Sequence, residues 1–137
     1  MANLLKYFEK NQKQIVEDIE NIVKAESPTL DKSLADQCAD ALMGLFRNRL
    51  GVEAELIPQQ KVGDHLRFSY GTGDRQLLIL THYDTVWDKG TLGYRVEGNK
   101  AYGPGIFDMK GGIIQVLWAL KACQDTAVDL KRKVVIL

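Results

Sequence analysis

The sequence predicts an α/β fold, in which helices cover a sheet. Residues 77–80 form a short apolar run, and residues 133–137 are apolar after Lys133, as expected of strands that are buried on both faces. Between them, a segment from Asp108 or Lys110 to about Gln124 is apolar on nearly every side of a helix, which predicts burial against the sheet. Strand, helix and strand in this order predict a right-handed parallel unit.

Two amphipathic helices are predicted before these strands. Over residues 3–25, apolar side chains recur at helical spacing with Glu and Lys between them, and Ser27-Pro28 ends the pattern. A second helix is expected from about Asp31, a suitable N-cap, to a stop at Gly51. Neither helix carries an evident functional group.

The segment that follows predicts short strands. From Val52 the apolar period changes to two, which predicts an edge-type strand, and residues 65–70 show the same alternation. The turn residues at 71–74 predict a hairpin between that strand and residues 77–80. Gly98-Asn99, between two short alternating segments, predicts a second hairpin.

Candidate chemistry lies just after the strand at residues 77–80. His82 and Asp84 are two positions apart, so in an extended chain both side chains point to the same side, where open sheets place ligands. Asp108 lies between two pairs of glycines, which let the backbone approach a ligand closely. Imidazole and carboxylate groups suit zinc, and a carboxylate often holds the second nitrogen of a histidine ligand. His82 and Asp84 can therefore supply a metal ligand, the group that orients it, or both.

Other interpretations compete with a metal site. Asp108 also suits the N-cap of the third helix, and both roles can coexist. Gly103-x-Gly105 resembles a dinucleotide motif but has Asp108 where the third glycine should stand, and a carboxylate would repel a pyrophosphate. Lys110 is interpreted as a helix-surface charge or as a group that steadies the glycine-rich loop. Trp87 is interpreted as packing beneath its loop rather than as a substrate platform.

The composition excludes several classes of function. Lys plus Arg and Asp plus Glu both number 18, so the net charge of 0 gives no reason to expect nucleic acid or an acidic membrane as a partner. Cys38 and Cys123 lie far apart, without C-x-x-C spacing, and are expected to be reduced. No apolar run approaches the roughly 18 residues of a membrane span, and the N-terminus lacks the apolar region of a signal peptide. We therefore expect a cytoplasmic protein.

Two motifs resemble a known family, the zinc-dependent glutamate carboxypeptidases with the related acetylornithine deacetylases and succinyl-diaminopimelate desuccinylases. His82-Tyr-Asp84-Thr-Val86 is similar to the family's His-x-Asp-x-Val. Residues 101–112, Ala-Tyr-Gly-Pro-Gly-Ile-Phe-Asp-Met-Lys-Gly-Gly, are similar to its glycine-rich segment that ends in Asp-Met-Lys-Gly-Gly. The sequence of residues 86–91 further favours the glutamate carboxypeptidase branch.

The resemblance implies a fold and a set of site residues. It implies a three-layer, mixed, mostly parallel sheet flanked by helices, of which residues 1–137 form the N-terminal half of the catalytic domain, without the remainder of that domain or the inserted small domain. It implies two zinc ions, with cobalt or manganese as substitutes. His82 would bind one zinc, Asp84 would orient that histidine and take part in catalysis, and Asp108 would bridge both ions. A cis peptide after Asp108 is also implied.

The implied activity is that of a two-zinc metallopeptidase or amidohydrolase. It would cleave an amide bond next to a carboxylate, in a small peptide or an N-acyl amino acid. The alternative is a truncated, non-catalytic fragment of such an enzyme, which folds without turnover. We expect weak zinc binding by these residues alone, and self-association into a homo-oligomer through the third helix and an unpaired strand at residues 134–137.

Overall fold

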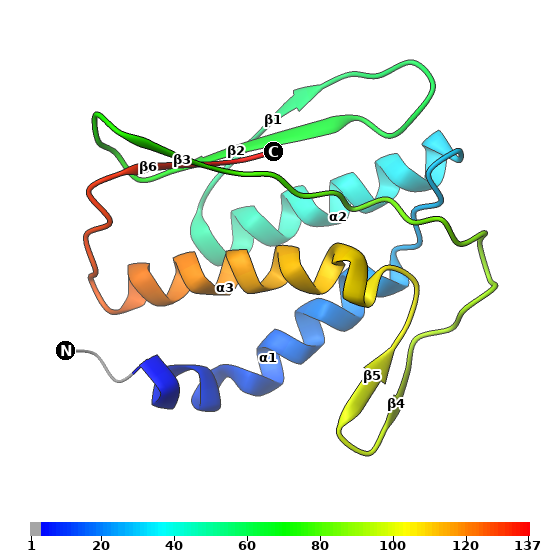
Figure 1. Ribbon diagram of the computed structural model, residues 1–137, viewed down its shortest axis with the longest axis horizontal. Helices are drawn as coiled ribbons and strands as arrows, with labels where there is room; N and C mark the ends of the chain where they lie inside the picture. Colours follow the sequence, from blue (N-terminus) through cyan, green and yellow to red (C-terminus); the bar gives the residue numbers. More distant parts are fainter. Residues whose placement is uncertain (1–3) are drawn as a thin grey trace.

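The computed structural model describes residues 4–137 and shows an α/β fold built on one mixed sheet (Figure 1). Residue 3, where the first helix was expected to begin, lies outside the described residues. The helices are α1 (Leu4–Lys24), α2 (Lys32–Leu50) and α3 (Gly111–Asp125). The strands are β1 (Ala54–Ile57), β2 (His65–Tyr70), β3 (Gln76–Ile79), β4 (Arg95–Glu97), β5 (Lys100–Tyr102) and β6 (Lys133–Ile136).

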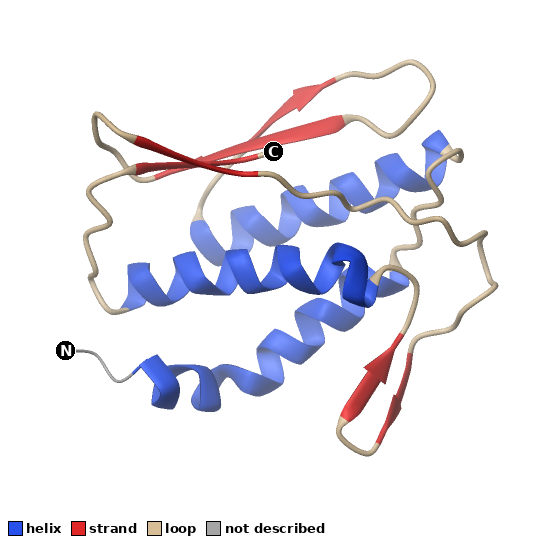
Figure 2. Ribbon diagram, in the orientation of Figure 1, coloured by secondary structure: helices blue, strands red, loops and turns tan. Residues whose placement is uncertain are grey.

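The main sheet has the strand order β1-β2-β6-β3. β3 and β6, which precede and follow α3 in the sequence, form the predicted parallel pair. The other two pairings, β1 with β2 and β2 with β6, are antiparallel, so the mixed sheet holds less parallel pairing than expected. Figure 1 shows all three helices on one side of this sheet, with α1 farthest from it. Figure 2 shows β4 and β5 as a separate hairpin beyond the helices.

Several residues that were expected to begin or end an element do so in the structure. The carboxylate of Asp31 accepts a hydrogen bond from the backbone N–H of Leu34 at 3.0 Å and so caps α2. Gly51 ends that helix in the left-handed conformation, with φ of 69°. Gly98, with φ of 62°, forms the turn between β4 and β5. Each signal acts over only a few residues, which is why sequence alone predicts it.

The hairpin predicted at residues 71–74 is wrong, because β6 lies between β2 and β3. The turn is wide enough to admit the chain that leads into β6. Gly73 has φ of 145°, and a Cβ atom there would lie only 2.7 Å from the carbonyl oxygen of Lys131. The turn glycines therefore make room for a third strand instead of closing a tight two-strand turn.

β3 is an edge strand of the sheet, so the expectation that residues 77–80 are buried on both faces is wrong. Leu77 and Leu78 are 49% and 57% exposed, since none of the described strands pairs with the outer edge of β3. β6 is the buried strand instead, and it has a partner on each side. The terminal strand is thus not the unpaired edge that was expected.

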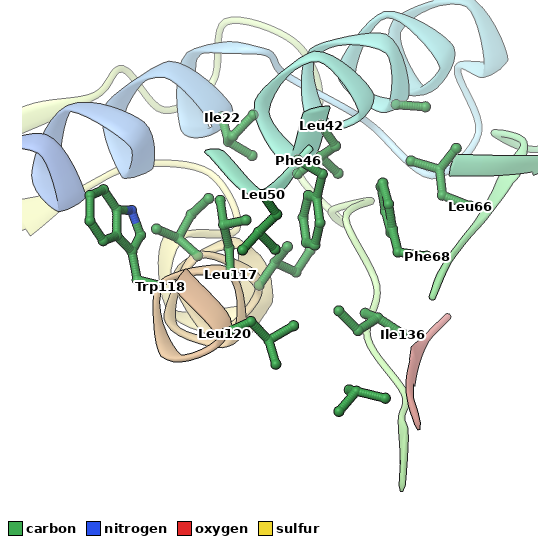
Figure 3. Packing of buried hydrophobic residues seen from close by; sticks show 14 of the residues in the cluster. Ile22, Leu42, Phe46, Leu50, Leu66, Phe68, Leu117, Trp118, Leu120 and Ile136 are labelled. Atoms are coloured by element: carbon green, nitrogen blue, oxygen red, sulfur yellow. The ribbon is translucent and has the colours of Figure 1, made fainter. Parts of the chain in front are cut away.

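The core lies between the sheet and the helices. Phe46 of α2 stacks on Phe68 of β2 with ring centroids 3.9 Å apart, and Figure 3 shows Ile136 of β6 beyond them. Leu117 of α3 is completely buried in the same cluster. Burying each such side chain contributes about 1.5–3 kcal/mol, so these contacts fix the sheet on α2 and α3.

Candidate metal centre

The structure brings His82 and Asp108 together, although 26 positions separate them in the sequence. His82 follows β3, and its Nε2 atom lies 2.8 Å from Oδ1 of Asp108, at the start of the segment that leads into α3. The other ring nitrogen, Nδ1, lies 3.2 Å from the carbonyl oxygen of Asp84 and 3.4 Å from its Oδ1. The imidazole is therefore held on both sides by the two predicted carboxylate residues.

The electrostatics of the site favour a positively charged imidazole. Partial burial alone lowers the pKa of His82. The hydrogen bonds to Asp108 and to the Asp84 backbone, together with the negative charges of both carboxylates, outweigh that effect and raise the pKa. The Asp108 side chain is 81% exposed and that of His82 is 44% exposed, so a cation from solution can reach both.

The loop that carries Asp108 is an irregular turn, Ile106–Lys110, rather than the first turn of a regular helix. Asp108 has φ of −125° and ψ of 95°, and its peptide bond to Met109 is cis, as the resemblance implied. The N-cap of α3 is Lys110, so the interpretation of Asp108 as that cap is wrong. Gly105 permits the close approach of this loop, because a Cβ atom there would lie 2.5 Å from Cγ2 of Thr85.

Lys110 is completely buried, so its interpretation as a helix-surface charge is wrong. Its Nζ atom donates to the carbonyl oxygens of Ile22 at 3.1 Å and of Ala25 at 2.7 Å, at the C-terminal end of α1. Burial lowers the pKa of Lys110. The contacts tie the Asp108 loop to α1, in agreement with the alternative that this lysine steadies the loop.

Ser27, expected only as part of a helix stop, and Thr29, for which no role was expected, both contact the segment that carries the site residues. The hydroxyl of Thr29 donates to Oδ2 of Asp84 at 2.6 Å, and that of Ser27 donates to the carbonyl oxygen of Tyr83, also at 2.6 Å. The backbone N–H of Thr85 donates to Ser27, and that of Thr29 donates to Thr85. The signal available in the sequence was the presence of two hydroxyl residues just past α1.

A cavity of about 430 Å³ opens beside the predicted site residues. His82, Asp84 and Asp108 lie on its wall. Its other lining residues include Trp87, Leu92, Arg95, Tyr102, Ile106 and Phe107. Trp87 is 44% exposed, so packing beneath the loop accounts for only part of its surface. The site is thus a carboxylate–imidazole pair beside a largely apolar hollow.

The donor set fits zinc, although this part of the chain supplies few ligands. Two atoms bound tetrahedrally to zinc at about 2.1 Å lie roughly 3.4 Å apart. Nε2 of His82 and Oδ1 of Asp108, now 2.8 Å apart, would need to separate by about 0.6 Å. Asp84 already occupies the position of a carboxylate that orients a histidine ligand. Among residues 4–137, no cluster of three or more His, Cys, Asp or Glu side chains could hold a metal ion.

Two further expectations concern cysteines and membranes. Cys38 is buried, Cys123 is partly buried, and both are free thiols, as expected. Within the described residues, none of the helices has the length and apolar character needed to cross a membrane.

Comparison with known sequences gives consistent matches. Residues 78–137 match the family model described as peptidase family M20/M25/M40. The chain is 36% identical over 123 residues to carboxypeptidase G2 of Pseudomonas sp. (strain RS-16), a match that covers 85% of this chain and 29% of the relative. It is 32% identical over 106 residues to acetylornithine deacetylase of Klebsiella pneumoniae (strain 342), a match that covers 72% of this chain and 27% of that relative. The chain thus spans less than a third of these curated relatives.

Solved structures share the fold. Human carnosine dipeptidase 1 matches with a TM-score of 0.80 at 18% identity, over 96% of this chain and 32% of that protein. The M20 family metallo-carboxypeptidase Sso-CP2 of Sulfolobus solfataricus matches with a TM-score of 0.74 at 22% identity, over 89% of this chain and 29% of that protein. At these identities the matches establish the shared α/β fold.

Proposed function

Since the chain belongs to peptidase family M20/M25/M40, we propose that residues 1–137 form the N-terminal half of the catalytic domain of a zinc-dependent metallohydrolase. The observation that carries this proposal is the convergence of His82 Nε2 and Asp108 Oδ1 at 2.8 Å, with Asp84 on the other side of the imidazole ring. The complete enzyme would use two zinc ions, whose remaining ligands would come from residues beyond these 137. We place this enzyme in the cytoplasm.

Each predicted residue has a separate task in this proposal. His82 would hold a metal through Nε2, Asp84 would orient the ring on its Nδ1 side, and the exposed carboxylate of Asp108 would be shared between the two metal ions. Zinc, when bound, acts as a Lewis acid toward the carbonyl group of the scissile amide. Because Asp84 acts through His82, we regard it as a positioning residue.

The cavity supports a substrate that carries a carboxylate. Arg95 brings a permanent positive charge to its wall, and its guanidinium carbon lies 4.3 Å from the centroid of the Tyr102 ring, which fixes its plane. Its Nε atom donates to Glu97 at 2.7 Å in an ion pair that offsets part of this charge, and a substrate carboxylate would bind to the donors that remain. The relatives are named a carboxypeptidase, a deacetylase and a dipeptidase. We therefore propose a small peptide or an N-acyl amino acid as substrate, cleaved at the amide bond next to the carboxylate.

A second candidate is a non-catalytic unit, which folds but does not turn over substrate. The observation that favours it for these residues alone is the absence of a third metal-binding side chain beside His82 and Asp108 within residues 4–137. A stable zinc site generally needs four ligands. We expect the isolated chain to be inactive and the complete protein to be the enzyme.

Zinc titration of the purified chain tests the metal centre. Calorimetry should show affinity on the order of micromolar or weaker, and the binding should disappear in His82→Ala, which removes one of the two direct ligands. His65→Ala is the matched control, because the chain has only two histidines. His65, on β2, lines a cavity with His82 but forms no hydrogen bond or ion pair with Asp84 or Asp108 in the described structure. Equal zinc binding by both variants would contradict the proposal. Hydrolysis of N-acetylglutamate by the zinc-loaded chain would show that these residues suffice for turnover.

A further inference from the structure

We propose that Thr29 is a positioning residue of the metal centre, whose hydroxyl group fixes the carboxylate that orients the histidine ligand. Thr29 lies in the connection between α1 and α2, far in sequence from His82 and Asp108. The inference rests on the function proposed above, and it adds a residue to the site from a separate part of the chain.

Four residues form a continuous line of contacts across the site. Oγ1 of Thr29 lies 2.6 Å from Oδ2 of Asp84. Nδ1 of His82 lies 3.4 Å from Oδ1 of the same carboxylate and 3.2 Å from the carbonyl oxygen of Asp84. Nε2 of His82 then lies 2.8 Å from Asp108. The two oxygens of Asp84 thus have different partners, and the bond to Thr29 holds the plane of this carboxylate toward His82.

The hydroxyl group of Thr29 has a second acceptor within reach, the carbonyl oxygen of Thr85 at 3.0 Å. A hydroxyl has a single hydrogen and cannot donate fully to both acceptors. The contact with Asp84 is shorter and involves a charged acceptor, and such hydrogen bonds are roughly twice as strong as neutral ones. Asp84 is therefore the preferred partner.

Thr29 can act in this way because its backbone is fixed. Its N–H donates to the carbonyl oxygen of Thr85 at 2.9 Å, and the N–H of Thr85 donates to Ser27 at 2.8 Å. Ser27 is completely buried, and its hydroxyl donates to Tyr83. These bonds tie the α1–α2 connection to the segment that carries His82 and Asp84. A positioning group held by such a support keeps a ligand in its productive geometry.

The test compares the zinc affinity of the whole chain with that of three variants, each of which replaces one threonine. Thr29→Val keeps the shape and removes the hydroxyl, so zinc affinity should fall by about tenfold, as for other groups that orient a ligand. Thr29→Ser restores the hydroxyl and should recover most of the affinity. Thr81→Val is the control, because Thr81 is a neighbouring threonine whose hydroxyl reaches Leu137 instead, and its zinc affinity should remain unchanged.

A second readout needs no metal. Nitrogen NMR of the histidine rings should show a changed Nδ1 signal for His82 in Thr29→Val and an unchanged His65 signal, because only His82 contacts Asp84. If zinc binding and the His82 signal are both the same in Thr29→Val as in the original chain, or if Thr29→Ser behaves like Thr29→Val, the inference is overturned. Failure of His82→Ala to weaken zinc binding would instead remove the proposed function, and the NMR signal would still decide the role of Thr29.

Discussion

Lys110 shows how a single residue joins the site to the rest of the fold. The last carbonyl groups of an α-helix have no partner within the helix, and Nζ of Lys110 donates to two carbonyls at the end of α1, those of Ile22 and Ala25. A positive charge there also faces the negative end of the helix dipole. The lysine two positions after Asp108 thus anchors the Asp108 loop to α1.

We expect Lys110→Met to lower the free energy of unfolding by about 1–3 kcal/mol, because the buried carbonyl group of Ile22 and the partly buried one of Ala25 lose their donor while the stem volume is retained. Urea unfolding monitored by circular dichroism measures this. Lys61→Met is the control, since Lys61 is exposed and its replacement should change stability by no more than about 0.5 kcal/mol. Equal effects of the two substitutions would show that the buried hydrogen bonds contribute nothing.

The residues of the candidate site were predictable to different degrees. Two sequence motifs pointed to His82, Asp84 and Asp108, and the structure brings these residues together, while their roles at a metal stay a prediction. The acceptors of Lys110 and the partner of Thr29 could not be predicted, because Ile22 lies 88 positions from Lys110 and Asp84 lies 55 positions from Thr29. Hydrogen bonds over such separations leave no periodic or local signal.

Some of the helices and strands could also be predicted from the sequence, and others could not. α2 and the β4–β5 hairpin follow from signals that act within a few residues, such as the cap at Asp31 and the turn at Gly98. The β2–β3 hairpin fails because β6, from a remote part of the chain, pairs with both strands. The glycine turn at residues 71–74 is compatible with either arrangement, so only the pairing of the complete sheet decides between them.

We expect Gly73→Ala to destabilise the chain by about 1–3 kcal/mol, because φ of 145° strains an alanine and the new Cβ atom would meet the carbonyl group of Lys131. Thermal unfolding measures this loss of stability. Gly93→Ala is the control, because no atom lies within 4 Å of the Cβ atom that it adds. Equal losses for the two substitutions would contradict the described conformation of the turn, with Gly73 beside the carbonyl group of Lys131.

At the scale of the whole molecule, the described sheet has an open edge at β3. Leu78 on β3 and Leu80 just after it are 57% and 65% exposed. Unpaired, apolar strand edges favour pairing with another chain. We therefore propose that the chain forms homo-oligomers through β3, instead of through α3 and the terminal strand.

Leu78→Lys should shift the chain toward the monomer, because a charge on an edge strand opposes strand pairing. Size-exclusion chromatography with light scattering at micromolar concentration measures the shift. Val96→Lys on the β4–β5 hairpin is the control, since Val96 is also 57% exposed but lies outside the main sheet. If the original chain is a monomer under these conditions, the proposed assembly through β3 is wrong.

The position of β6 between β2 and β3 also sets the order in which the strands can pair while the chain is being synthesised. β2 and β3 leave the ribosome long before β6, and they share no hydrogen bonds with each other in the completed sheet. The nascent chain can form α1, α2 and the β1–β2 pair, but β3 must wait for residues 133–136. The closing of this sheet carries the entropy cost of a long loop, which is the property that slows the folding of proteins with non-local contacts.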